Sequence, residues 1–327
     1  MASFRQRGDK WQARVIRDGY PDQTKTFESK ADAEKWARSL ESEIDKGQFV
    51  NVSEAQRTTL GDVIARYLEE VTPSMKGAAE DKIRLKAMMR KPIARWSMAN
   101  LSASRIAAFR DERLKEVSAG TVIRELAYLS AIINHARREW GFNVPNPVQM
   151  VRKPPSPQAR ARVLTDEEVA RLLQALEPVG RRSHWTKPAV QLALATAMRR
   201  GELLSLRWEH VDLIGRAAFL PETKNGDSRT VPLSSAAVQV LAALPRHISG
   251  AVFPVKAFTL DAAFKRGLRR ADLQDVRFHD LRRTAITRMA EKLPNVIELA
   301  AVSGHKSLMV LKRYYRPTAA ELAKKLG

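Results

Sequence analysis

The stretch His279-Asp280-Leu281-Arg282-Arg283-Thr284 decides how this chain is interpreted, together with Gly304-His305-Lys306-Ser307 and Arg313-Tyr314-Tyr315-Arg316. The three segments bring two histidines, several arginines and a tyrosine pair close together in the sequence, with no paired carboxylates or thiols among them. This combination suits a phosphate that is attacked by a phenol. The predicted substrate is therefore a phosphodiester in DNA.

The local spacing supports a shared site. Residues 279–291 have the apolar periodicity of a helix, so His279 and Arg282 lie three positions apart on one side of it and can touch the same phosphate. A short second helix then ends at Gly304, a predicted C-terminal cap that directs the chain towards His305. Each piece alone would be interpreted as an ordinary basic helix face. Their joint occurrence favours a functional site.

Three segments match one known pattern in both residue type and spacing. His279-Asp280-Leu281-Arg282, then Ser303-Gly304-His305-Lys306-Ser307-Leu308, then Arg313-Tyr314 resemble the C-terminal signature of the tyrosine recombinases, the phage-integrase family. The family's usual nine-residue step after the second histidine selects Tyr314 as the nucleophile. The resemblance also implies an upstream arginine and a lysine in a hairpin.

The upstream arginine is found in residues 196–204, which resemble the first arginine box of the family. Arg199 falls on the catalytic position, and Glu202 follows three residues later, where it can hold the arginine. The family commonly has glycine where this chain has Ala197. Two other interpretations stay open: Arg200 as the site residue, or an Arg199–Glu202 ion pair that is only structural.

The hairpin lysine is Lys224. Residues 217–221 and 229–233 predict two strands, and the Asn-Gly pair in Lys224-Asn225-Gly226-Asp227 between them is a strong tight-turn signal. Lys224 matches the family's hairpin lysine, which the resemblance assigns to protonation of the departing 5′ oxygen. Without the other motifs, a solvated turn lysine would be the interpretation.

Length, charge and cysteine content bound the class of protein. A chain of 327 residues predicts two or three domains, and 57 Lys and Arg against 36 Asp and Glu give a net charge of +21, which favours nucleic acid as partner. No apolar run predicts a membrane helix or signal peptide. The absence of cysteine excludes disulfides and a thiol nucleophile, and is compatible with the predicted cytoplasmic location. No His and carboxylate cluster has metal-ligand spacing, so neither a metal nor a cofactor is expected.

Residues 1–52 predict a small sheet with a helix. Strands are expected over 3–7, 10–17 and 23–27, and a helix over 29–46 would cover one face of the sheet. This arrangement resembles the arm-type DNA-binding domain of many phage-type integrases. The alternative is a compact basic domain that does not enter a groove. The uncovered face would leave four basic residues for DNA: Arg5, Arg7, Lys10 and Arg14.

Residues 58–142 predict an all-helical domain, and Thr59-Leu60-Gly61-Asp62 resembles the opening of the family's core-binding domain. Residues 143–162 combine five prolines with four basic residues and predict a stiff linker, either a strap around a duplex or an ordinary spacer. The catalytic domain is expected over 163–327. The helices expected in the second domain are 60–70, 78–90, 104–117 and 121–140.

The predicted fold class is mostly α with small β elements: an α+β multidomain chain with a tyrosine-recombinase-like catalytic domain. The resemblance implies that Tyr314 attacks the scissile phosphate and forms a 3′-phosphotyrosyl link. It implies that Arg199, Arg282 and His305 bind the non-bridging oxygens, and that His279 assists proton transfer from the tyrosine. The expected activity is site-specific DNA recombination, with a type IB topoisomerase or a non-catalytic DNA-binding protein as alternatives.

The implied partners follow from the same resemblance. They are double-stranded DNA, other copies of the chain in a synaptic tetramer on DNA, and accessory DNA-bending proteins, with no membrane partner. Residues 318–326 predict a short C-terminal helix with Leu322 and Leu326 on one side. In the family such tails often pack on a neighbouring subunit, whereas the alternative is a tail that completes its own domain.

Overall fold

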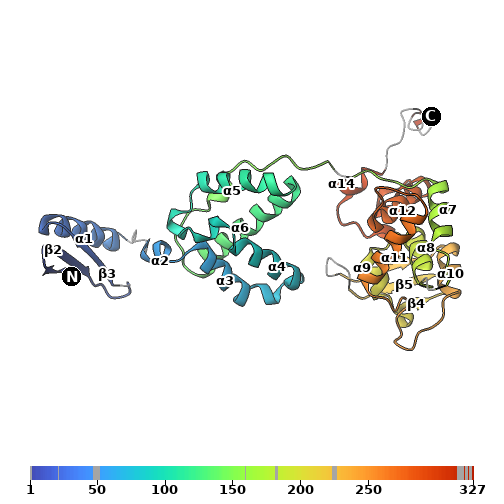
Figure 1. Cartoon of the computed structure of the whole chain (residues 1–327), viewed down its shortest axis with the longest axis horizontal. Coiled ribbons are helices and arrows are strands. Elements are labelled where there is room, and N and C mark those ends of the chain that lie inside the picture. Colours follow the sequence, from blue (N-terminus) through green and yellow to red (C-terminus); the bar gives the residue numbers. More distant parts are fainter. Residues whose placement is uncertain are drawn as a thin grey trace. The chain divides into compact units, whose positions relative to one another are not determined.

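The structure of the chain is a computed structural model. It describes residues 2–20, 22–46, 52–158, 160–180, 183–222, 227–314, 320, 323 and 326–327, without the side chains of residues 52 and 53. The chain divides into two compact units, Met1–Gln158 and Ala159–Gly327, each of which is described by itself (Figure 1). Helices dominate, and the described residues form two three-stranded sheets. The prediction of a mostly helical chain with small β elements is confirmed.

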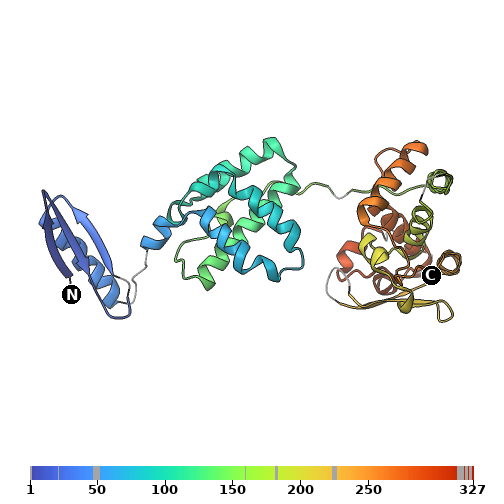
Figure 2. The ribbon, with the colours of Figure 1, turned by 60° about the horizontal axis from the view of Figure 1, so that its bottom comes forward.

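The first unit begins with an antiparallel sheet in the order β1 (Ala2–Arg7), β2 (Lys10–Val15) and β3 (Gln23–Phe27). Helix α1 (Lys30–Asp45) lies along one face of this sheet (Figure 2). The side chain of Ser29 accepts a hydrogen bond from the Asp32 backbone N–H and so caps the helix start. A small apolar cluster joins helix and sheet: Val15, Ala37, Leu40 and Ile44.

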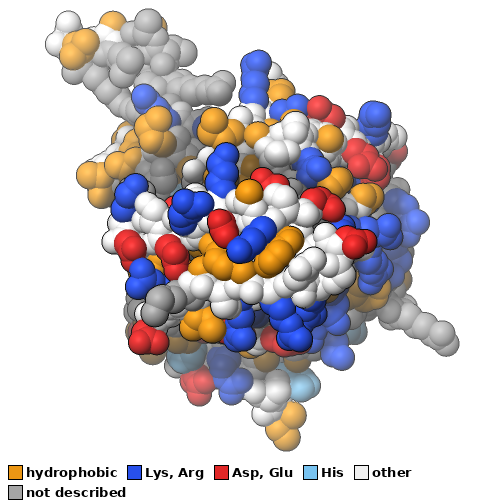
Figure 3. Space-filling model, turned by 90° about the vertical axis from the view of Figure 1, so that its left-hand side faces the viewer, with side chains coloured by type: hydrophobic (Ala, Val, Ile, Leu, Met, Phe, Trp, Pro, Cys, Tyr) orange, Lys and Arg blue, Asp and Glu red, His pale blue; other side chains and the backbone are white. Residues whose placement is uncertain are grey.

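The sheet face away from α1 carries the predicted basic residues. Arg5 pairs with Gln12 and Arg7 with Lys10 across the strands, so their side chains share one face. Lys10 forms an ion pair with Glu28 at 2.8 Å, and Arg14 forms one with Asp22. On the side of the molecule shown in Figure 3, acidic side chains lie among the basic ones. The positive charge available for DNA is therefore lower than the sequence suggests.

The rest of the first unit is helical, and α6 (Ala119–Glu139) packs against α3 (Leu60–Glu70), α5 (Ala103–Glu116) and η4 (Pro147–Met150). Thr59 and Asp62 form the reciprocal hydrogen bonds of a capping box at the start of α3. Helix α6 buries a continuous apolar face that includes Leu126, Leu129 and Ile133. The elements are α2 (Val52–Arg57), α3 (Leu60–Glu70), η1 (Thr72–Ser74), α4 (Ala78–Met89), η2 (Pro92–Arg95), η3 (Met98–Asn100), α5 (Ala103–Glu116), α6 (Ala119–Glu139) and η4 (Pro147–Met150).

The buried core of the helical part includes residues on both sides of the range 58–142. Ala55 of α2 is buried in the helical core, so this core begins before residue 58. Val144, Val148 and Val151 are buried in the same core, although they fall in the predicted linker. Asn146 donates hydrogen bonds to Ser130 and Asn134. The prolines prevent a regular α-helix, but apolar residues between them still pack, so the extended segment starts only after Val151.

The second unit packs its helices around a core that includes α8 and also buries one side of a small sheet. Strands β4, β5 and β6 are antiparallel in that order, and Ala218, Leu220 and Val231 face the core. The elements are α7 (Asp166–Ala175), α8 (Thr186–Thr196), α9 (Arg200–Ser205), η5 (Trp208–His210), β4 (Val211–Asp212), β5 (Ala217–Leu220), β6 (Arg229–Pro232), α10 (Ser235–Ala242), α11 (Ala257–Arg270), α12 (Phe278–Lys292), α13 (Val296–Ser303) and α14 (Leu308–Leu311).

The end of the linker forms hydrogen bonds with α12. The guanidinium of Arg160 donates to both carboxylate oxygens of Asp280, at 2.9 to 3.1 Å, and the backbone N–H of Leu164 donates to the Thr284 hydroxyl at 3.0 Å. Arg162 pairs with Glu168. Two of the linker's basic residues thus form ion pairs within the second unit. In the part of the chain that is described, no helix is long and apolar enough to cross a membrane.

Candidate active site

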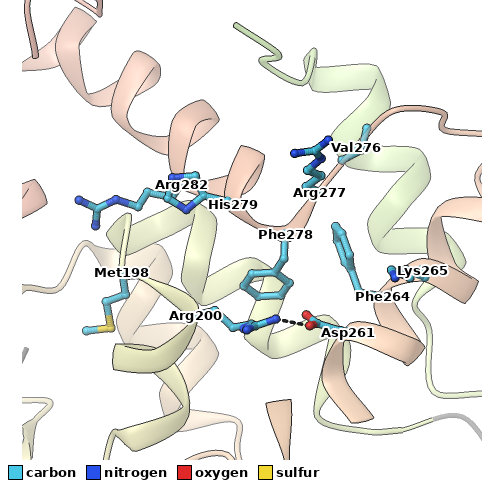
Figure 4. Close-up of a pocket in the computed structure, with 10 residues that line it drawn as sticks. All are labelled: Met198, Arg200, Asp261, Phe264, Lys265, Val276, Arg277, Phe278, His279 and Arg282. Carbon is cyan, nitrogen blue, oxygen red and sulfur yellow. Dashed lines mark hydrogen bonds and ion pairs between the residues drawn. The ribbon is translucent and has the colours of Figure 1, made fainter. Parts of the chain in front are cut away.

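Helix α12 positions the first pair of predicted site residues. Its N-terminus is capped by Asp280, whose carboxylate accepts the Arg277 backbone N–H at 2.8 Å, and Leu281 and Ala285 bury its inner side. His279 is exposed, whereas the Arg282 residue is only 3% exposed. Figure 4 shows both side chains leaving the same helix.

Three arginines from separate segments meet at the C-terminal end of α13. Arg229 donates to the carbonyl of Val302 at 2.8 Å, Arg282 to that of Ser303 at 2.7 Å, and Arg199 to that of Gly304 at 3.3 Å. Three successive carbonyls therefore each accept from a different guanidinium. Cations are favourable at this end of a helix, where the carbonyls have no partner within the helix.

Ala197, where the resemblance leads us to expect glycine, adopts the left-handed conformation in the turn before Arg199. Ala197 has φ 54° and ψ 20°, it is fully buried, and its carbonyl accepts a hydrogen bond from Arg282. An L-residue in this region costs about 1–2 kcal/mol. The left-handed conformation of Ala197 therefore lowers the stability of the fold slightly, and the buried contacts of Ala197 maintain this conformation.

The carboxylate of Glu202 accepts hydrogen bonds from two of the arginines, Arg199 and Arg229. One carboxylate oxygen accepts from the Arg199 guanidinium at 2.6 Å, and the other accepts from the Arg199 backbone N–H at 2.9 Å and from Arg229 at 2.8 Å. Burial alone would raise the pKa of Glu202, but these donors lower it below its ordinary value. The carboxylate therefore stays ionised. The Arg199–Glu202 ion pair considered as a structural alternative is present, and it also orients Arg199 within the cluster.

The two histidines lie in a strongly positive environment. Burial, Arg282 and Arg199, in that order, lower the pKa of His305 to about 4. The protein around its ring and the nearby Arg282 also lower the pKa of His279. The Nδ1 atom of His305 lies 2.8 Å from the Ser303 hydroxyl, which fixes the orientation of the imidazole. Both rings are neutral at neutral pH without DNA.

A phosphate bound in this cluster would offset the positive charge of the arginines, which contributes to the low pKa of His305. We expect the His305 pKa to rise on DNA binding, so that the complex takes up protons between about pH 4 and 6.5 and affinity increases as pH falls through this window. Isothermal titration at pH 5.5 in two buffers of different ionisation enthalpy measures this uptake. His305→Gln should reduce it. Equal heats in both buffers would contradict the prediction.

Tyr314 lies beside this cluster. Its ring centre is 6.5 Å from that of His305, and the guanidinium of Arg283 lies 5.5 Å from the ring centre. The backbone N–H of Tyr314 donates to Leu311, which is fully buried in a small core shared with α12 and α13. Anchored in this way, the phenol is held near the histidine and arginines. The neighbouring Tyr315 lies outside the described residues.

The structure brings together five of the six predicted site residues. Lys224 lies outside the described residues, between β5 and β6. Arg200, the alternative to Arg199, pairs with Asp261 on the wall of a neighbouring cavity of about 380 Å³, which His279 and Arg282 also line (Figure 4). Among the described residues, no three His, Asp or Glu side chains are grouped to hold a metal ion.

Sequence reasoning missed Arg229. Its side chain is 12% exposed, and its partners lie 27 and 73 residues away in the sequence. Its position at the start of a predicted strand suggested only a sheet residue. The available signal was its inward place in the strand pattern, where an arginine must find acceptors within the protein.

The cluster thus combines a buried carboxylate, three guanidiniums, two imidazoles and a nearby phenol. The chain matches the phage integrase family over residues 162–321 and the N-terminal domain of phage integrases over residues 56–153. It is 40% identical to the shufflon-specific DNA recombinase of Escherichia coli, over 83% of this chain and 72% of that protein. It is 37% identical to a Haemophilus influenzae relative whose name assigns it to the integrases/recombinases, over 98% of this chain and 89% of the relative. The chain therefore belongs to the phage integrase family of tyrosine recombinases.

Solved structures show the same fold at low sequence identity. Residues 75–356 of lambda integrase, in a dimer bound to a core site, superpose with a TM-score of 0.66 at 22% identity, covering 80% of this chain and 97% of that one. The Tn1549 transposon integrase in complex with circular-intermediate DNA gives a TM-score of 0.69 at 16% identity, covering 82% and 98%. The predicted tyrosine-recombinase-like fold is confirmed.

Proposed function

We propose that this enzyme is a site-specific DNA recombinase that cuts and rejoins strands through a 3′-phosphotyrosyl intermediate. The observation that carries the proposal is the convergence of Arg199, Arg282, His305 and Tyr314, from separate segments, on one cluster. Two guanidiniums and an imidazole supply donors for the non-bridging oxygens. The phenol lies next to them, where a phosphate bound by these donors would be within reach of attack.

The reaction follows from these positions. Arg199 and Arg282 are already aligned, so they stabilise the charge that develops on the phosphate without rearrangement. His279, neutral because its pKa is lowered, can accept the proton of Tyr314, whose ordinary pKa of about 10 makes it a poor nucleophile without help. Attack forms the phosphotyrosyl bond as the 5′ oxygen leaves, and Lys224 donates a proton to that oxygen. The link conserves the bond energy, so rejoining needs no ATP.

A nicked-duplex trapping assay tests the proposal. A nick close to the scissile position lets the short leaving strand diffuse away, so an active enzyme stays covalently joined to the DNA. Joining of strands between two duplexes then distinguishes a recombinase from a topoisomerase that only relaxes supercoils. The absence of any covalent product on a duplex that the protein binds specifically would instead indicate a non-catalytic DNA-binding protein.

Self-association on DNA is part of the proposal. Lambda integrase, with a TM-score of 0.65 to this chain, has been solved as a tetramer bound to a Holliday junction. In this chain Leu326 of the C-terminal tail is 88% exposed, so it does not pack on its own unit. A groove of about 700 Å³ with a largely apolar wall, including Leu173, Leu194 and Met289, lies between α7, α8, α10 and α12. We propose that this groove receives the tail of a second copy.

Removal of the tail should separate recombination from DNA binding. Deletion of residues 318–327 is expected to impair strand exchange strongly and to leave binding to a single core site unchanged, because the deleted residues follow the proposed nucleophile. Leu194→Glu in the groove should reproduce this defect, since a charge there excludes an apolar side chain. Gel-shift titrations and an exchange assay measure the two activities. Equal loss of both would favour a tail that completes its own domain.

Removal of the N-terminal sheet unit should leave core-site cleavage intact. A chain that lacks residues 1–52 keeps Ala55, which belongs to the helical core, and all six proposed site residues. We expect normal trapping on a short core site and weaker assembly on longer DNA with arm sites. Circular dichroism checks that the truncated chain is folded. Loss of trapping by a well-folded truncation would contradict this assignment.

A further inference from the structure

Arg229 belongs to none of the predicted motifs. Its guanidinium links the Glu202 carboxylate to the end of α13. Its two terminal nitrogens donate to different segments, one to the Val302 carbonyl and the other to the Glu202 carboxylate, each at 2.8 Å. Both acceptors are fixed: Glu202 has a side chain only 3% exposed, and Val302 lies in the last turn of α13. Arg229 therefore connects β6, α9 and α13 through one planar group.

The glycine of the histidine motif makes room for this arginine. Gly304 has φ 68°, a conformation that favours glycine, and a Cβ built there would lie 2.8 to 2.9 Å from three atoms of the Arg229 side chain. The same residue therefore serves two purposes. It turns the chain towards His305 and it lets the guanidinium of Arg229 lie against the backbone.

The contact with Glu202 leads to Arg199. The carboxylate oxygen that accepts from Arg229 also accepts from the Arg199 backbone N–H, and the other oxygen accepts from the Arg199 guanidinium. The fork of Arg229 thus sets the rotation of the carboxylate plane, which in turn sets the direction of Arg199. A lysine at position 229 would keep the charge but could not span both acceptors in one plane.

We infer that Arg229 is a positioning residue for strand cleavage, which acts through Glu202 on Arg199. The inference rests on the proposed function, because it assigns Arg199 to the phosphate. The recombinase motifs assign the phosphate to Arg199 and Arg282, whereas Arg229 lies outside them and donates to Glu202 and Val302. We therefore expect its replacement to change the geometry of the bound phosphate and not the affinity for DNA.

Single-turnover cleavage of a nicked duplex at saturating protein tests the inference. Arg229→Lys should lower the cleavage rate by about tenfold to a hundredfold, the loss that a small misplacement of a catalytic group causes, with unchanged affinity for the uncut site. The matched control is Arg216→Lys at the other end of the β5–β6 pair, where Arg216 donates to the Leu233 carbonyl and the Ser235 hydroxyl. This control should cleave at the wild-type rate.

The same substitution in an Arg199→Ala background shows whether the effect passes through Arg199. We expect Arg229→Lys to add no further loss of rate there, whereas a general loosening of the fold would lower both backgrounds by the same factor. Thermal melting and DNA affinity confirm that each variant is folded. Wild-type cleavage by Arg229→Lys, or equal losses in both backgrounds, would overturn the inference. Absence of cleavage by the unmodified chain would instead remove the proposed function.

Discussion

Replacing Tyr314 by Phe is expected to abolish the covalent protein–DNA product while DNA binding and folding survive. The change removes only the phenolic oxygen, which is the proposed attacking atom. The phenyl ring keeps its packing beside Leu311 and its place under the Arg283 guanidinium. Denaturing gels of the nicked-duplex reaction measure the product, and gel shifts measure binding.

Tyr315→Phe is the matched control, because it removes the same atom from the adjacent residue. The nine-residue step from His305 selects Tyr314, so only this phenol is assigned to the phosphate. The Tyr315→Phe variant should still become joined to DNA. A dead Tyr315→Phe together with an active Tyr314→Phe would move the nucleophile by one position.

Replacing Arg282 by Lys is expected to lower cleavage by about 10²–10³, the effect of losing one aligned donor for the developing charge. Arg282 spans two carbonyls, those of Ala197 and Ser303, from a nearly inaccessible position, and burial together with Arg199 lowers its pKa to about 10. A lysine supplies a single ammonium and leaves one of these acceptors without its partner. We therefore also expect a loss of about 1–3 kcal/mol in the free energy of unfolding.

The control for Arg282 lies on the same helix. Arg288 pairs with Asp166 near the surface, so Arg288→Lys should change neither cleavage nor stability by much. Cleavage is measured at saturating protein and at a temperature where circular dichroism shows both variants folded. A normal cleavage rate for Arg282→Lys would refute its assignment to the phosphate.

Much of the local structure could be predicted because it depends on neighbouring residues. The three N-terminal strands and the long helix α6 match their predicted ranges within about two residues, since alternation and helical periodicity are local signals. The helix that carries His279 and Arg282 was predicted for the same reason. The comparisons confirm the family that these motifs indicated.

The misses depend on packing between distant segments. The valines after Phe142 looked like part of a proline-rich linker, and only the presence of α6 beside them gives them a core to join. The role of Arg229 depends on acceptors in two other elements, so no local pattern contains it. Likewise, the ion pairs of Arg160 and Arg162 reduce the free charge of the linker, which a count of basic residues cannot reveal.

The three arginines that end on the carbonyls of Val302, Ser303 and Gly304 bear on how such a protein can change during evolution. Each guanidinium caps a helix as well as serving the site, so selection for a folded chain preserves all three even in a descendant that no longer cuts DNA. The hydroxyl of Tyr314 takes no part in these three bonds and can be lost without harm to them. We therefore expect a retained arginine cluster to be weaker evidence of activity than a retained tyrosine at the position of the proposed nucleophile, Tyr314.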